Sequence, residues 1–417
     1  MSSKSDCMSD YDPDSLSVAE ALRRIETDIA PLTESELLPL REGLGRVLAE
    51  DMFSPIDVPA HTNSAMDGYA VDSADLPAGG TNTLTVIGTA WAGKPFTGVL
   101  RAGQCVRIMT GAVIPDGADT IIMQERVERQ DGAIQIGTDN KPGQNIRRAG
   151  EDIARGQIVL KAGKLLGPAE LGVLASLGIA HVKVIRRLRV AFLATGDELR
   201  ALGEPLQLGE IYDSNRYTLY GMLSRLGVQI IDLGIVRDRP EDIKTAFSEA
   251  ARTADAVISS GGVSVGEADY VKEIVGSLGR VHFWKIAMKP GRPLAFGKLG
   301  ETLFFGLPGN PVSAMTTFYQ FVQPALQRLM GQTARQPLLI KLPTLSQLKK
   351  NPGRMEFQRG IAAIGENGQL AVSSTGEQGS GILSSMSKAN CFIVLPAEAG
   401  TVAAGSLVDV QLFEGLI

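Results

Sequence analysis

Four short segments between residues 195 and 313 carry side chains that can bind an anion or a metal ion. Segment 195–199 (TGDEL) sets two carboxylates beside a glycine, and segment 259–269 (SSGGVSVGEAD) offers hydroxyl and N–H donors followed by two more carboxylates. Small residues ahead of a helix are typical of anion sites. Ordinary helix caps and first-turn acids have the same composition, so the spacing alone leaves both interpretations open. Segment 259–269 matches neither a Walker A loop nor a GxGxxG loop.

Basic residues dominate the third segment. Lys285 and Lys289 are expected on one face of a strand, and Arg292 follows a Pro-Gly turn. Lysines at the end of a buried strand favour an anionic ligand, such as a phosphate or an oxyanion, over a solvated face. The fourth segment, 306–313 (GLPGNPVS), joins a strand to a helix with Asn at the N-cap and Pro at the first helical position. It is either an anion or nucleotide contact or a plain structural cap.

The four segments belong to one block, residues 188–331, in which predicted strands and helices alternate. This alternation predicts a doubly wound α/β domain with a parallel sheet, and ligands bind such sheets beyond the carboxyl ends of the strands. Glycine-rich loops, cations and acids at one edge predict a phosphorylated or nucleotide-bearing ligand with a divalent metal ion. The predicted strands are 190–193, 228–236, 256–259, 281–288 and 303–305, and the predicted helices are 214–226, 238–254 (capped by Asp238), 267–278 and 310–330.

The remaining residues predict three further parts and a tail. Apolar residues at helical spacing are followed by short apolar runs between turn residues, and then by helical spacing again. This order indicates a β-rich domain inserted into a segmented one. Within the segmented domain, helices are expected over 15–30, 40–49 and 168–177. The expected organisation is a disordered tail (1–14), a segmented linking domain (15–53 and 143–187), an inserted β-rich domain (54–142), the doubly wound domain (188–331) and a C-terminal β domain (332–417).

The composition argues against several classes of protein. A net charge of −5 without a basic domain is not typical of nucleic-acid binding, and the basic run 186–189 is expected to be a solvated strand entrance. Three widely spaced cysteines form no disulfide framework, and three scattered histidines form no zinc motif. Neither a signal peptide nor a window of 18 apolar residues is present, so a cytosolic protein without a membrane span is expected.

At the four segments the sequence resembles the MoeA family. The motifs TGDEL, DSN, SSGGVSVGEADY, FWKIAMKPGRPLAFG and GLPGNPVS occur in the family's order and spacing. The SGGVSVG motif alone would be shared with molybdopterin adenylyltransferases, but the upstream NSAMDGYA and the downstream β domain distinguish the two. Further matching stretches are 54–59, 63–70, 107–112, 143–148, 352–354 and 379–381.

The resemblance implies a four-domain homodimer that binds adenylylated molybdopterin. With Mg²⁺ the enzyme takes up molybdate, releases AMP and leaves molybdenum on the dithiolene; other enzymes of the pathway are possible partners. Arg292 stands where relatives can have lysine, which keeps the charge but changes the donor geometry. The family's acids and bases carry over onto Asp67, Thr110, Glu198, Asp238, Asp269, Lys285, Lys289 and Arg354 and, less closely, Ser380. The ligand-binding loops supply Thr195, Gly196, Asp197, Ser259, Gly261, Gly262, Ser264, Gly266, Arg292, Pro308, Gly309, Asn310 and Ser313.

The resemblance also suggests roles for these residues. Glu198 and Asp269 would hold Mg²⁺ or position the incoming oxyanion, and the two lysines would neutralise the phosphate or the molybdate. Asp67 and Thr110 would reach the site from the partner chain. Two other functions stay open: an adenylyltransferase that makes the adenylate from ATP, and a scaffold like the gephyrin-type animal relatives.

Overall fold

The computed structural model describes residues 14–261, 270–333, 337–365 and 368–413. They form two compact units, which are described separately. The first unit contains the chain up to Glu36, Gly45–Val47 and the part from Ile185 onward, and the second contains Leu37–Leu44 and Leu48–Val184. Four residues of the predicted site, Gly262, Ser264, Gly266 and Asp269, lie outside the described residues.

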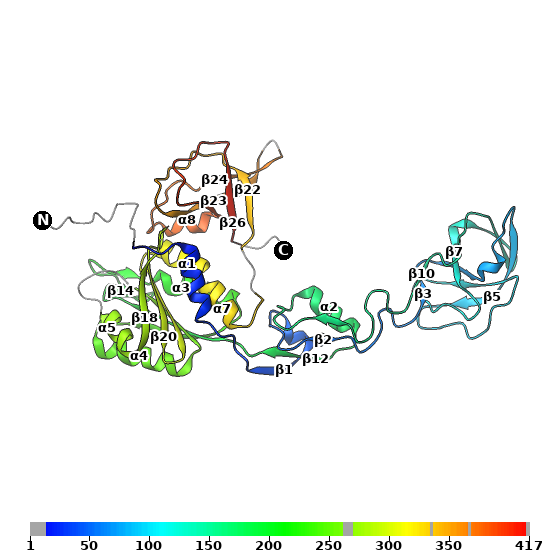
Figure 1. Cartoon of the computed structure of the whole chain (residues 1–417), viewed down its shortest axis with the longest axis horizontal. Coiled ribbons are helices and arrows are strands. Elements are labelled where there is room, and N and C mark those ends of the chain that lie inside the picture. Colours follow the sequence, from blue (N-terminus) through cyan, green and yellow to red (C-terminus); the bar gives the residue numbers. More distant parts are fainter. Residues whose placement is uncertain (1–13, 262–269, 334–336, 366–367, 414–417) are drawn as a thin grey trace. The chain divides into compact units, whose positions relative to one another are not determined.

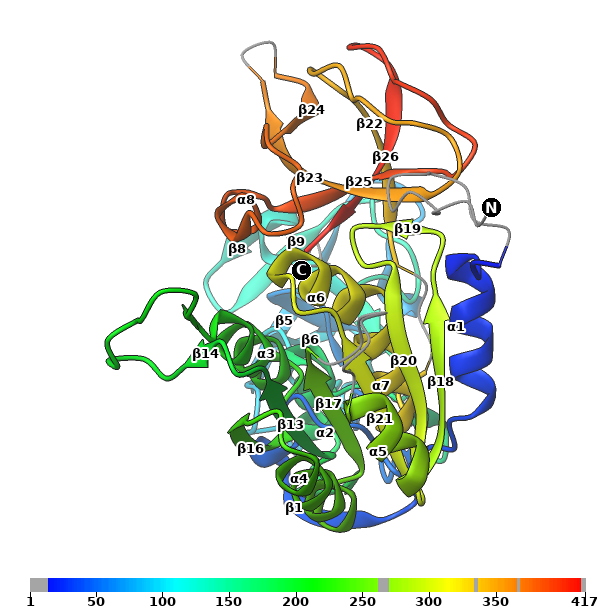
Figure 2. The same ribbon diagram turned by 90° about the vertical axis from the view of Figure 1, so that its left-hand side faces the viewer.

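The first unit is built on a six-stranded sheet in the order β16-β13-β17-β21-β20-β18 (Figures 1 and 2). The first four strands are parallel, which confirms the doubly wound prediction. The last two are antiparallel, because the chain returns through tight connections instead of helices. The bounds are β13 Arg189–Thr195, β16 Gln229–Val236, β17 Ala256–Ser260, β18 Gly279–Lys285, β20 Pro293–Leu299 and β21 Thr302–Leu307.

Helices cover both faces of this sheet because successive strand residues point to opposite sides. Phe192 packs into the apolar core shared with α1, α3, α6 and α7, whereas Leu193 packs into the core shared with α4 and α5. The predicted long helix is confirmed, but a π-helical segment, η4, separates its halves. The bounds are α1 Val18–Thr27, α3 Ser214–Arg225, α4 Pro240–Thr253, α5 Tyr270–Leu278, α6 Pro311–Thr317, η4 Phe318–Val322 and α7 Gln323–Leu329.

Two predictions for this block are wrong. The strand expected over 281–288 ends at Lys285, because the Ile286 N–H donates to the carbonyl of Arg292 and the chain then enters another sheet. Lys285 and Lys289 therefore do not share a strand face. Asp238 does not cap α4, since Pro240 starts the helix one position later and Arg239 stands at the N-cap without a side-chain hydrogen bond.

The predicted C-terminal β structure is confirmed as a curled sheet in the order β19-β23-β25-β26-β22, with β24 paired to β23. Its core is apolar and includes Leu342, Ile393 and Val410. The bounds are β19 Met288–Lys289, β22 Leu339–Pro343, β23 Met355–Ile364, β24 Leu370–Ser374, β25 Cys391–Leu395, β26 Leu407–Leu412 and α8 Leu383–Lys388; the short strands β14 Leu199–Arg200 and β15 Ile211–Tyr212 pair beside the main sheet.

The second unit contains the predicted β-rich insertion, a six-stranded sheet in the order β7-β4-β6-β5-β9-β8. The helix expected over 40–49 is wrong: only the 3-10 turn η1 Leu40–Gly43 forms, and Gly45 then adopts a positive φ of 71°. The bounds are β1 Ser35–Pro39, β2 Met52–Phe53, β3 Asn63–Ser64, β4 Gly68–Val71, η2 Ser73–Asp75, β5 Asn82–Ala90, β6 Gln104–Ile108, β7 Thr120–Met123, η3 Gln124–Arg126, β8 Val127–Gln130, β9 Ala133–Ile136, β10 Ile146–Arg147, β11 Ile158–Leu160, α2 Pro168–Ser176 and β12 His181–Ile185.

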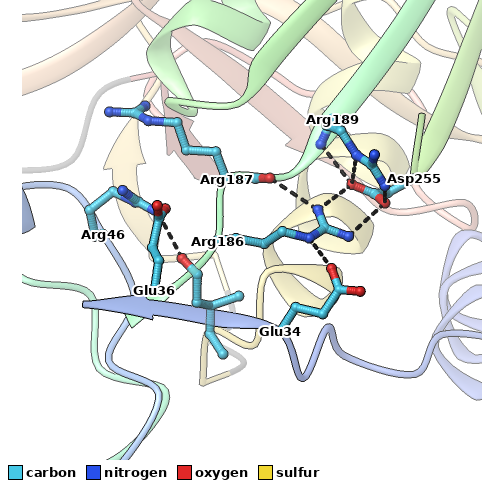
Figure 3. Close-up of polar contacts among 8 residues, drawn as sticks. Glu34, Glu36, Arg46, Arg186, Arg187, Arg189 and Asp255 are labelled. Carbon is cyan, nitrogen blue, oxygen red and sulfur yellow. Dashed lines mark hydrogen bonds and ion pairs between the residues drawn. The ribbon is translucent and has the colours of Figure 1, made fainter. Parts of the chain in front are cut away.

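The basic run 186–189 is not a simple solvated entrance. Arg186 and Arg189 bind the carboxylate of Asp255, at 2.7 and 2.9 Å, and Arg186 also pairs with Glu34 (Figure 3). Arg187 donates to the carbonyl of Gly227 at 2.7 Å. The run therefore joins the start of β13 to the start of β17. Separately, none of the helices in the described part of the chain is long and apolar enough to cross a membrane.

Candidate functional site

The loops after β13 and β17 meet where the strand order of the main sheet reverses. From β13 the chain moves to one side of the sheet, and from β17 it continues to the other. Doubly wound sheets bind ligands at such a switch point, beyond the carboxyl ends of the strands, and we call this place the crevice. Gly261 follows β17 with a φ of 92°, and a Cβ there would lie 2.6 Å from the carbonyl oxygen of Thr195. Only glycine fits this contact, so the close approach of the two predicted loops depends on it.

Four buried polar side chains near these strand ends have an atom without a partner in the described residues. They are the hydroxyls of Thr195 and Ser259 and one oxygen each of Asp213 and Asn215. Buried polar atoms are normally hydrogen-bonded, so the missing partners come from a ligand, from water or from residues outside the described part of the chain. Two of the four, Thr195 and Ser259, are predicted site residues.

Asp213 and Asn215 were missed as site residues, although both lie in the DSN motif. Asp213 is the N-cap of α3, and its other oxygen accepts the Arg216 N–H at 3.0 Å. Asn215 donates to the Ser260 hydroxyl and to the Gly309 carbonyl, both at 2.7 Å, and so connects α3 to two predicted ligand loops. Burial raises the pKa of the Asp213 carboxyl. An Asp or Asn at a helix start is a common cap, so its type alone could not reveal a site.

Three acids gather at the edge of the same crevice. The Asp238 N–H donates to the Asp197 carboxylate at 3.3 Å, and burial and the charges of Asp197 and Glu198 raise the pKa of Asp238. The Glu198 carboxylate lies over Gly196, where a Cβ would come within 2.6 Å of it. Carboxylate oxygens are the ligands that Mg²⁺ prefers. The described residues alone do not form a set of three metal ligands, and the predicted fourth acid, Asp269, lies outside them.

A cavity of about 540 Å³ adjoins these acids. Gly196 and Asp197 line it together with three arginines, Arg200, Arg237 and Arg239. Arg200 is held by the carboxylate of Glu210 and by two loop carbonyls, whereas Arg237 and Arg239 flank Asp238 at the start of α4. Glu204 lines the cavity as well, so arginines and carboxylates both face it. The sequence did not single out these arginines.

The basic residues of the site come together where β19 and β23 pair in the C-terminal sheet. β19 pairs in parallel with β23, which places Met288 opposite Met355 and brings Arg354, just before β23, next to the segment 285–292. Lys289 forms an ion pair of 3.3 Å with the buried Glu356. We call Lys285, Lys289, Arg292 and Arg354, with the first turn of α6, the cationic corner.

Gly291, between Lys289 and Arg292, packs this corner against α6. A Cβ there would lie 2.6 Å from the hydroxyl of Thr317, the last residue of the helix, and 3.5 Å from the carbonyl oxygen of Ser313, in its first turn. The Val312 N–H donates to the carbonyl of Ser380 at 3.1 Å. The predicted residues Pro308, Gly309 and Asn310 lie in the turn that leads into α6, and Ser313 lies in the first turn of the helix. The Asn310 side chain does not cap α6.

Asp67 and Thr110 are together in the second unit. β4 and β6 pair with Gly68 opposite Ile108, which sets the loops before β4 and after β6 side by side. The Asp67 carboxylate accepts the Thr110 N–H at 2.7 Å and its hydroxyl at 2.8 Å, and these two bonds lower the pKa of Asp67. Both residues are exposed. The predicted residues thus form three described groups: the crevice acids and loops, the cationic corner and the Asp67–Thr110 pair.

Comparison with known protein families gives three matches along the chain. Residues 16–178 match the MoeA N-terminal region (domain I and II), and residues 341–413 match the MoeA C-terminal region (domain IV). Residues 191–328, which hold the crevice, match a probable molybdopterin binding domain.

Individual relatives are similar over most of their length. The molybdopterin molybdenumtransferase of Haemophilus influenzae is 50% identical over 388 residues, which cover 92% of this chain and 95% of the relative. That of Nostoc sp. is 37% identical, with 89% and 87% covered. The crystal structure of the molybdopterin biosynthesis moeA protein from Pyrococcus horikoshii is 30% identical, with a TM-score of 0.84 over 96% of this chain and all of that one.

Proposed function

Because the chain belongs to the MoeA family, we propose that it inserts molybdenum from molybdate into adenylylated molybdopterin, with Mg²⁺-dependent release of AMP. The observation that carries this proposal is the set of unpartnered buried atoms on Thr195, Ser259, Asp213 and Asn215. They line the strand ends where a doubly wound sheet binds its ligand, and they offer both donors and acceptors. A polar heterocycle with a phosphate group would satisfy both kinds.

The charges divide the site between the two substrates. Molybdate is a dianion, and the cationic corner offers the positive charge that stabilises an oxyanion. Lys289 also forms an ion pair with Glu356, and we expect Lys285, Lys289, Arg292 and Arg354 to bind molybdate together. The nucleotide phosphate would lie nearer the arginine-lined cavity.

Mg²⁺ fits the acidic group at the crevice. Glu198 would hold it together with Asp269. Burial, and then the charges of Asp197 and Glu198, raise the pKa of the neighbouring Asp238. When bound, the ion would offset the negative charge of the phosphates.

We further propose that the active protein is a homodimer. Several large apolar side chains are exposed on the β14–β15 loop, which projects from the sheet, and on α3 (Figure 2). Exposed apolar patches of this kind mark protein interfaces. A dimer would also allow Asp67 and Thr110 to complete the site of the partner chain. The exposed residues are Leu202, Leu206, Leu208, Ile211, Tyr217 and Tyr220.

The deciding measurement is AMP release from adenylylated molybdopterin in Mg²⁺, with and without molybdate. Molybdate-dependent release is expected for the wild-type protein, and Glu198→Gln should reduce it at least about a hundredfold. Glu249→Gln, on the exposed face of α4, is the matched control and should keep the wild-type rate. Tight binding of the adenylate without release would instead support a scaffold. Consumption of ATP with free molybdopterin would support an adenylyltransferase.

A further inference from the structure

Arg359, on β23, is a buried arginine whose partners among the described residues are all neutral. Only 1% of it is exposed. Its Nε donates to the Ser385 hydroxyl at 3.0 Å, and its Nη2 donates to the carbonyls of Gly379 and Glu377 at 3.0 and 3.4 Å. Burial lowers the pKa of Arg359 to about 10, so the side chain remains charged at neutral pH. A buried charge without a counter-ion is costly, and its retention therefore calls for a reason.

The main chain of Arg359 binds the same loop from the other side. Its N–H donates to the Gln378 side chain at 2.8 Å, and its carbonyl accepts the Thr375 N–H at 3.0 Å and the Gln378 amide at 3.1 Å. The loop 375–379 is thus fixed by hydrogen bonds from both the backbone and the guanidinium of one residue. This loop leads directly into Ser380, whose carbonyl meets the first turn of α6.

We infer that Arg359 is a positioning residue that holds loop 375–380 so that Ser380 completes the cationic corner as an oxyanion site. The inference rests on the proposed function. Carbonyl oxygens carry negative partial charge and would repel an oxyanion if they turned toward it. Arg359 draws the carbonyls of Glu377 and Gly379 to itself. Its own uncompensated charge also makes the surrounding potential more favourable for a dianion.

A double-mutant cycle on molybdate binding tests this inference. The dissociation constant of molybdate is measured by equilibrium dialysis for the wild-type protein, Arg359→Lys, Ser380→Ala and the double variant. Lysine keeps the charge but cannot bind the hydroxyl and both carbonyls in the fork geometry of arginine. Each single change should weaken binding about tenfold, and the double variant should be no weaker than the worse single one. The KM for molybdate should rise in parallel, with kcat changed less than threefold.

Ser385→Ala is the matched control inside the same buried cluster. It removes the partner of the Arg359 Nε but leaves both carbonyl bonds, so the molybdate dissociation constant should stay within about twofold of wild type. The inference would be overturned if Arg359→Lys and Ser380→Ala had additive effects on the binding free energy of molybdate. It would also be overturned if Arg359→Lys bound molybdate as the wild type does while Ser380→Ala bound it more weakly. If the wild-type protein does not bind molybdate, the proposed function itself fails, which distinguishes the two results.

Discussion

At the scale of single residues, the site combines buried groups that stability alone does not favour. Asp213 is 3% exposed and has one oxygen without a partner in the described residues. Within the same residues, the buried cation of Arg359 has no counter-ion. Each costs folding free energy. Both lie at or behind surfaces that we assign to ligands, which is where proteins retain such groups. Replacing such a buried charged side chain by a neutral one should stabilise the folded protein and weaken the binding of its ligand.

Asp213→Asn tests this balance. The pKa of Asp213 is raised in the folded protein, so its contribution to stability is present below the ordinary value of 3.8 and is lost as pH rises through the folded pKa. Asparagine still caps α3 and does not titrate. At pH 7 the variant should therefore be more stable by about 1 kcal/mol, and the gain should vanish below pH 4. Urea unfolding at the two pH values measures this, together with binding of the adenylylated substrate, which should weaken.

The control for this prediction is Glu249→Gln, an exposed acid on α4. It should change neither the pH dependence of unfolding nor substrate binding. An Asp213→Asn protein that is less stable than wild type at pH 7 would show that the charged carboxylate stabilises the fold, contrary to the argument from burial.

At the scale of elements, ion pairs and close glycine contacts fix the strands that carry the loops. Asp255 stands just before β17 and binds Arg186 and Arg189 at the start of β13 (Figure 3). Its carboxylate also accepts the Arg189 N–H at 2.8 Å. These contacts hold the amino ends of the two strands together, at the end of the sheet opposite the crevice.

Asp255→Asn should destabilise the first unit. Burial acts against ionisation, but the hydrogen bonds from Arg186 and Arg189 hold the pKa of Asp255 at about 2. The stability from this depressed pKa is present above 3.8 and is lost as pH falls toward 2. We expect a loss of about 2–3 kcal/mol at pH 7, shrinking near pH 2. Urea titrations of both proteins at pH 7 and pH 2.5 check it; an equal loss at both values would contradict the ionic explanation.

Gly261→Ala should disrupt the crevice. The new Cβ would meet the Thr195 backbone at 2.6 Å in a conformation with a φ of 92°, and backbone cannot move aside as a side chain can. A loss of roughly 2 kcal/mol and weaker substrate binding are expected. Gly276→Ala is the matched change, because it lies in α5 with nothing within 4 Å and should stabilise the protein by about 0.5–1 kcal/mol. Thermal unfolding and adenylate binding compare the two variants; equal behaviour would contradict the prediction.

At the scale of the whole molecule, the division of the predicted residues between two units raises the question of which chain completes each site. Asp67 and Thr110 belong to the second unit, whereas the crevice and the cationic corner belong to the first. The exposed apolar side chains of the β14–β15 loop and α3 favour association of two copies. If two protomers share a site, two variants that are inactive for different reasons can form one complete site in a mixed dimer.

The Asp67→Asn and Asp238→Asn proteins should each be inactive. When the two are mixed and their subunits exchange, activity should return. In a shared site, each mixed dimer holds one site with both native acids, so about a quarter of wild-type AMP release is expected from random association. No recovery would show that each chain forms its site alone. Adding Leu208→Glu and Tyr220→Glu to both proteins should abolish recovery, and light scattering should then report monomers.

Much of this organisation was predictable from the sequence. Periodic apolar residues with glycine stops predicted α2 and α3, and the alternation of strands and helices predicted the parallel half of the main sheet, because these signals are local. The motifs around Thr195, Ser259 and Gly309 marked the ligand loops for the same reason.

Only the tertiary structure revealed what depends on contacts between distant segments. The break between Lys285 and Lys289 arises because β19 pairs with β23, about seventy residues later. Asp255 beside the run 186–189, and Arg359 behind Ser380, are likewise long-range partners without a local signal. The sequence by itself determined the elements and the chemistry of their loops, since both follow from residue type and spacing. The burial of a side chain and its pairing with a distant residue set its charge state and its orientation, and both arise only when the chain has folded.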